Sequence, residues 1–120
     1  MRHHNKNKKF GRQTGEREAM MRSLVVSLIT HEKIMTTEAR AKALRPAIEK
    51  MVTRARGGTI ADVRLIKSRL NNNVSITNKL VKEIAPKFKG QNGGYTRITK
   101  IGAHTRPGDA SPLATIEFVK

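Results

Sequence analysis

Residues 37–58 read TEARAKALRPAIEKMVTRARGG, and this stretch decides the fold. Thr37 is a favoured N-cap residue and the Gly57-Gly58 pair stops a helix, so the sequence between them predicts one long helix. Its apolar side chains recur every three or four residues along one face: Ala41, Leu44, Ile48, Val52 and Ala55. Pro46 removes one backbone hydrogen bond within this pattern. We expect it to kink the helix rather than end it, because the same apolar face continues beyond it.

The same periodicity predicts three shorter helices around this one. The first runs from about Glu16 to Thr30. A third helix begins after Thr59 and a fourth after Asn73, because both residues are good N-caps. Pro86 is expected to close the fourth helix, since proline cannot continue the backbone hydrogen bonding.

Three β-prone segments complete the predicted domain. A short one, Lys33–Thr36, precedes the long helix, and two longer ones follow the last helix at Tyr95–Ile101 and Leu113–Val119. Residues 102–112 form the loop between the last two. The order of elements predicts a two-layer α+β fold, α-β-α-α-α-β-β, in which helices cover one face of a small antiparallel sheet.

The charge of the chain indicates its partner. There are 25 Lys and Arg against 9 Asp and Glu, a formal net charge of +16 on 120 residues. Such a surplus destabilises a compact chain by self-repulsion unless a polyanion neutralises it, and nucleic acid carries the densest row of negative charge. Residues 1–15 are basic and contain no acid. We therefore expect an extended nucleic-acid-binding arm over residues 1–15 and a single domain over residues 16–120.

Other functional classes find little support in the sequence. The absence of cysteine excludes disulfides and thiolate metal sites. His31-Glu32 begins like the zinc motif H-E-x-x-H, but Met35 stands where the second histidine should be. Gly90 and Gly93-Gly94 lack the G-K-[ST] ending of a phosphate loop. We expect no enzyme, no cofactor, no metal, no small-molecule substrate and no membrane partner, since no apolar run approaches the roughly 18 residues of a membrane span.

The remaining sequence features narrow the kind of nucleic-acid-binding protein. One Tyr, three Phe and no Trp are too few aromatic residues for a sheet that stacks bases. The third and fourth helices resemble a helix-turn-helix in order, but residues 74–85 offer few side chains for reading base edges. We favour a protein that binds structured RNA through its backbone. A nucleoid or DNA-architectural protein and a free RNA chaperone stay open as alternatives.

Several stretches carry a family resemblance. They are MRH at residues 1–3, LITHEKIMTTEARAK at 28–42, GGYTRI at 93–98, RPGD at 106–109 and IEFV at 116–119. Together they closely resemble the bacterial-type ribosomal protein L17 family of the large subunit, and the resemblance covers essentially the whole chain. There are two departures: residues 14–17 read TGER where the family usually has SSHR, and the loop at Gly57-Gly58 is short.

The resemblance implies a structural constituent of the large ribosomal subunit with the fold order given above. It implies binding to large-subunit rRNA near the outlet of the nascent-peptide tunnel, beside neighbouring large-subunit proteins, without catalysis. We expect a cytoplasmic ribosome. An organellar ribosome stays open, although the sequence shows no transit peptide and no secretory signal.

Three clusters of side chains are expected to contact the rRNA. The basic arm contributes Arg2, His3, His4, Lys6, Lys8, Lys9 and Arg12. The entry and first half of the long helix contribute Lys33, Thr36, Thr37, Arg40 and Lys42. The first long strand and the loop after it contribute Tyr95, Arg97, Lys100, His104 and Arg106. Two of these residues have a second interpretation, Thr37 as a helix cap only and Tyr95 as a core residue.

Overall fold

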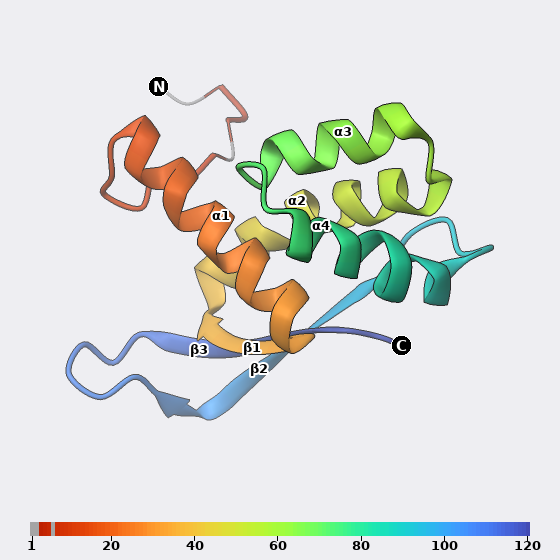
Figure 1. Ribbon diagram of the computed structural model, residues 1–120. Coiled ribbons are helices and arrows are strands. Elements are labelled where there is room, and N and C mark those ends of the chain that lie inside the picture. Colours follow the sequence, from red (N-terminus) through yellow and green to blue (C-terminus); the bar gives the residue numbers. More distant parts are fainter. Residues whose placement is uncertain (1–2, 6) are drawn as a thin grey trace.

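Strand β3 (Pro112–Phe118) lies at the centre of the sheet in the computed structural model, which describes residues 3–5 and 7–120 apart from the side chains of residues 103 and 104. It pairs antiparallel with β1 (Lys33–Thr37) on one side and with β2 (Thr96–Thr105) on the other. The helices all lie on one face of this sheet (Figure 1). The predicted α+β class is therefore confirmed.

Alternation along β3 explains why the sheet has one covered face. Ala114, Ile116 and Phe118 are buried, whereas the residues between them are only partly buried. Successive side chains of a strand point to opposite faces, so the buried set faces the helices and the other set forms the open face. Register pairs place Lys33, Glu117 and Arg97 in one row across that open face.

Helix α2 (Glu38–Gly57) packs between the sheet and the other helices, which are α1 (Thr14–His31), α3 (Ile60–Arg69) and α4 (Val74–Lys79). It runs continuously through Pro46, as its apolar pattern predicts. The predicted stripe is buried: Ala41, Leu44, Ile48 and Val52 are fully inaccessible to solvent and Ala55 nearly so. No helix in the described part of the chain is long and apolar enough to cross a membrane.

The predicted helix caps form. The Thr37 hydroxyl accepts a hydrogen bond from the Arg40 N–H at 3.4 Å and the Thr59 hydroxyl accepts one from the Asp62 N–H at 3.2 Å. The Asn73 side-chain oxygen accepts one from the Ile76 N–H, also at 3.2 Å. Each cap satisfies a backbone donor that has no partner inside its own helix.

The end of the fourth helix differs from expectation. Pro86 does not close it: α4 continues as a π-helical turn over Leu80–Ile84 and a 3-10 turn over Ala85–Phe88. A proline is tolerated early in a helical turn, where its missing N–H needs no partner inside the turn. The extra turn carries Phe88 into the core, where it is fully buried.

Strand β2 is also longer than predicted. It extends into the expected loop as far as Thr105, which pairs with Pro112 after a register irregularity that follows Ile101. The remaining connection closes on itself, because the Arg106 N–H donates to the Ser111 carbonyl at 2.9 Å. Residues 102–104 of β2 have no paired residue on β3, and pairing resumes at Thr105.

Replacing Glu49 with leucine is expected to lower the free energy of unfolding by about 1–3 kcal/mol. The Glu49 carboxylate accepts hydrogen bonds from the Thr96 N–H at 3.3 Å and the Thr96 hydroxyl at 2.9 Å, and Thr96 is buried. Leucine leaves both donors without that partner where β2 meets α2. Urea denaturation measures the loss. Glu16→Leu on the exposed first turn of α1 is the control and is expected to change stability little.

Candidate nucleic-acid interface

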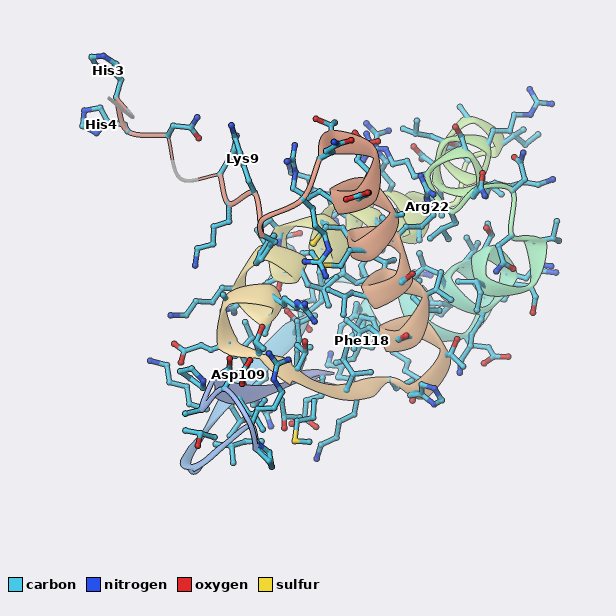
Figure 2. All side chains as sticks on the ribbon, turned by 90° about the vertical axis from the view of Figure 1, so that its left-hand side faces the viewer. His3, His4, Lys9, Arg22, Asp109 and Phe118 are labelled. Atoms are coloured by element: carbon cyan, nitrogen blue, oxygen red, sulfur yellow. The ribbon has the colours of Figure 1, made fainter. Side chains whose placement is uncertain are left out.

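The positive surplus lies outside the sheet. Residues 32–38 and 95–119, which hold the three strands and the β2–β3 loop, contain four Lys or Arg and four Asp or Glu. Their formal charges cancel, so the surplus of +16 belongs to the rest of the chain: the arm, the helices, Lys89 and the terminal Lys120. The arm with His3 and His4 lies at the top of the view in Figure 2, and the β2–β3 loop with Asp109 lies at the bottom.

Every cation of the sheet segments has a carboxylate partner. We call these cations, Lys33, Arg97, Lys100 and Arg106, the sheet quartet. Glu117 lies 3.7 Å from Lys33 and 3.6 Å from Arg97 across the open face. Glu38 holds Lys100 at 3.4 Å, and Arg106 pairs with Asp109.

Glu38 also binds Lys42 on the next turn of α2, at 2.7 Å. The hydrogen bond from Lys42, with further hydrogen-bond and charge contributions from Lys100, lowers the pKa of the Glu38 carboxyl. Glu38 stays ionised at neutral pH, so the two lysines share one negative charge. Their charge is less available to an outside anion than that of an unpaired cation.

A broad groove of about 1310 Å³ opens where the arm, α1, α2 and the end of α3 meet. We call it the arm–helix groove. Figure 2 shows Lys9 on the arm and Arg22 on α1 in a view of this side of the molecule. Seven cations line the groove: Lys8, Lys9, Arg17, Arg22, Lys42, Lys50 and Arg69. Only one carboxylate, Glu18, joins them in the lining.

Six of these seven cations are not neutralised. Among the described residues, only Lys42 of the set has a carboxylate within 4.0 Å. We name the four unpaired cations that the helices contribute, Arg17, Arg22, Lys50 and Arg69, the groove quartet. Like charges gathered around one hollow repel each other and attract a polyanion, and this potential is focused where walls exclude water.

The end of the arm is held by a tight turn beside the groove. The Arg12 N–H donates to the Lys9 carbonyl at 3.1 Å, and the Arg12 guanidinium donates to the Phe10 carbonyl at 3.0 Å. Phe10 and Gly11 both have positive φ, at 53° and 64°. This turn brings Lys8 and Lys9 to the mouth of the groove.

A smaller polar hollow of about 390 Å³ adjoins the groove. Arg22 and Leu70 line both. Ser27, Asn71 and Asn73 contribute further hydrogen-bonding groups to the smaller one. The two hollows follow each other along α1, so a single extended ligand can pass from one to the other.

The structure separates the predicted contact residues into different surroundings. His3, His4, Lys8 and Lys9 are exposed on the arm, whereas Arg2 and Lys6 lie outside the described residues. Arg40 and Thr36 are half-buried beside α2, and Thr37 serves as the N-cap of that helix. The side chain of His104 also lies outside the described part.

Tyr95 follows the second of its two interpretations, as a core residue. Its side chain is 1% exposed and packs edge-on against Phe88, with ring centroids 5.1 Å apart. Its hydroxyl lies 3.1 Å from the Thr53 hydroxyl and 3.3 Å from the Gln91 carbonyl, which it donates to. A ring buried in this way is not available to RNA, so Tyr95 is a core residue.

Sequence reasoning missed the groove quartet. Lys50 was visible only as a cation beside the apolar stripe of α2, and Arg17 and Arg22 only as charges on α1. A signal did exist: Ala43, Pro46 and Ala47 are small residues between Lys42 and Lys50 on one side of α2. Small side chains leave space between packed helices, and in this protein cations line that space.

The Arg106–Asp109 pair predicts a pH effect at the tip of the β2–β3 loop. Hydrogen bonds from the Arg106 guanidinium, and then from the Ser111 N–H, lower the pKa of the Asp109 carboxyl. Because this pKa lies below the unfolded value of about 3.9, the pair stabilises the loop fully above about pH 4. The stabilisation is lost as the pH falls through the folded-state pKa.

Carboxyl ¹³C titration by NMR tests this expectation. We expect the Asp109 midpoint to lie well below 3.9 and to rise toward that value in Arg106→Gln. Arg97→Gln, on the sheet away from the loop tip, is the control and should leave the midpoint unchanged. A midpoint near 3.9 in the unmodified chain would contradict the pairing.

Paired sheet cations, a strongly basic arm and a cation-lined groove define a small α+β protein with its unpaired positive charge gathered on one side. In the described residues no group of three His, Cys, Asp or Glu could hold a metal.

Comparison with known proteins gives the family. A sequence profile described as Ribosomal protein L17 matches residues 20–119. The chain is 51% identical over 120 residues to the large ribosomal subunit protein bL17 of Persephonella marina, covering all of this chain and 96% of that protein. It is 49% identical to bL17 of Hydrogenobaculum sp., with both chains fully covered, and 49% identical to bL17 of Thermomicrobium roseum, with 99% of each covered.

The chain therefore belongs to the ribosomal protein L17 family. Membership of this family makes it a structural constituent of the large ribosomal subunit, a ribonucleoprotein component in translation, and not an enzyme.

Proposed function

We propose that the chain binds large-subunit rRNA through its basic arm and the arm–helix groove, near the outlet of the nascent-peptide tunnel of a cytoplasmic ribosome. The observation that carries this proposal is the location of the charge. The sheet segments are neutral, and six cations without carboxylate partners in the described residues surround one groove. Phosphates brought to that groove release counterions and relieve the repulsion among its cations.

The arm contributes a different kind of contact. Its cations lie on a narrow segment with little apolar surface, which reaches between RNA helices where a folded domain does not fit. Ordering such a segment costs conformational entropy, which phosphate contacts and counterion release offset.

We expect the sheet quartet to contribute less to rRNA binding than the groove cations. Each of its members forms an ion pair with a carboxylate, and that pair must break or weaken before the cation can bind a phosphate. The open sheet face suits a neighbouring ribosomal protein better, because its two cations, Lys33 and Arg97, share Glu117 and because it presents Met35, which is 64% exposed. A photo-crosslinking residue at position 35 in intact large subunits would be expected to label protein rather than rRNA.

Co-sedimentation with large subunits after a high-salt wash tests the proposed function most directly. We expect the full chain to remain with the subunit, and hydroxyl-radical footprinting to show rRNA protection that is lost when the groove quartet is replaced. Release by the wash, together with equal affinity for duplex DNA at matched salt, would instead indicate a DNA-architectural protein. Abundance far below that of ribosomes would indicate a free RNA chaperone.

A further inference from the structure

The arm–helix groove has an apolar lining that attraction for phosphates does not explain. Met21 of α1 and Ala47 and Met51 of α2 line it together with Phe10 of the arm. Met51 is nearly buried, whereas Met21, Ala47 and Phe10 are partly exposed. Apolar surface recessed between cations gains stability when a ligand removes it from water.

The size of the hollow indicates a ligand larger than a single small molecule. Its volume of about 1310 Å³ exceeds the roughly 300–1,000 Å³ of ordinary ligand pockets. The small side chains of α2 create this room, since Pro46 and Ala47 stand where larger residues would reach α1. The occupant must therefore be extended, anionic and partly apolar.

We propose that the arm–helix groove binds an unpaired stretch of RNA, with its phosphates on the groove cations and its bases or riboses against the apolar lining. This inference rests on the proposed rRNA binding and specifies the form of RNA that the groove takes. A duplex presents phosphates and hydroxyls outward and keeps its bases stacked inside, so it offers nothing apolar to fill the recess. An unpaired strand exposes both kinds of surface.

Phe10 provides the most specific contact. It is the only aromatic side chain in the groove lining, and the turn at Phe10-Gly11 holds it beside Lys8 and Lys9. Base stacking on an aromatic ring tolerates any sequence, because every base has a π face. The RNA strand can then continue past Arg22 into the polar hollow that Ser27 and Asn71 line. The hydroxyl and amide groups of these two residues can form hydrogen bonds with riboses and phosphates.

Filling the groove without altering its charge tests the inference. The probes are a 12-nucleotide single-stranded RNA and a 12-base-pair RNA duplex, each titrated with the full chain by fluorescence anisotropy at matched salt. Ala47→Leu is expected to weaken single-strand binding about fivefold or more, to leave duplex binding unchanged and to preserve the salt dependence of both. Ala61→Leu is the matched control, because Ala61 is an exposed α3 residue outside both hollows, and it should change neither affinity.

A crosslinking measurement on the unmodified chain avoids any folding defect of the variant. A 4-thiouridine oligonucleotide is expected to crosslink to Phe10, Met21 or Met51 and not to Met35 on the open sheet face. Crosslinks confined to residues outside the groove would overturn the inference. An unchanged affinity of Ala47→Leu for the single-stranded RNA would also overturn the inference. In that case the proposed function would still stand if both RNAs bind with a steep salt dependence. A chain that binds neither RNA in a salt-dependent way would overturn both proposals.

Discussion

Replacing the groove quartet with glutamine is expected to weaken binding to large-subunit rRNA by roughly 100-fold at 0.15 M salt. Each cation that neutralises a phosphate adds about 0.7 to the slope of log affinity against log salt for an unpaired strand. Four lost contacts should therefore lower that slope by about 3. The expectation follows from the absence of carboxylate partners around these cations in the described residues. Filter binding or anisotropy from 0.05 to 0.5 M salt measures both quantities.

The sheet quartet provides the matched comparison, because it removes the same formal charge. Its cations already share carboxylates, so their replacement with glutamine should lower the slope by less than about 1. Equal losses from the two quartets would show that net charge alone governs binding. A larger loss from the sheet quartet would place the rRNA at the sheet and the β2–β3 loop.

The helices were predictable from the sequence because their signals are local. The spacing of the apolar residues alone predicts the buried face of α2. Thr37, Thr59 and Asn73 are recognisable as N-caps because each directly precedes a helical apolar pattern. Glycines at residues 57 and 58 mark the end of α2 equally well, and Gly58 adopts a positive φ of 67°.

The errors fall where distant packing overrides local preference. Pro86 predicts a helix end, yet burying Phe88 against Tyr95 and Phe118 favours another turn. The continuation of β2 to Thr105 likewise depends on pairing with Pro112, which spacing within one strand does not reveal.

The candidate site was only partly visible in the sequence for the same reason. Composition gives a net charge but not which cations are neutralised. Five predicted contacts are paired with carboxylates in the structure: Lys33, Lys42, Arg97, Lys100 and Arg106. The groove depends on helices that are far apart in sequence, so Arg69 and Arg17 are brought together only by the fold. Tyr95 had both an RNA-contact and a core interpretation, and the fold places its ring in the core.

Replacing Phe88 with alanine is expected to lower the free energy of unfolding by about 3–5 kcal/mol. Its ring is fully buried and contacts Tyr95 and Phe118, with centroids 5.1 Å and 6.1 Å away. Truncation removes the apolar contact and leaves a cavity where the final 3-10 turn meets the sheet. Since domains of this size are stable by only about 5–15 kcal/mol, the variant should unfold at markedly lower urea concentration.

Phe10→Ala distinguishes the structural role of Phe88 from the RNA-binding role that we propose for Phe10 in the groove. Phe10 is a partly exposed residue of the arm, so its replacement should change the free energy of unfolding by no more than about 0.5 kcal/mol. The same replacement should weaken binding to single-stranded RNA, because the groove loses its aromatic contact. Phe88→Ala should act in the opposite way, with a large loss of stability and an unchanged RNA affinity for the folded fraction. If the two variants lost stability equally, the arm would have to pack as part of the core, and the extended arm would be ruled out.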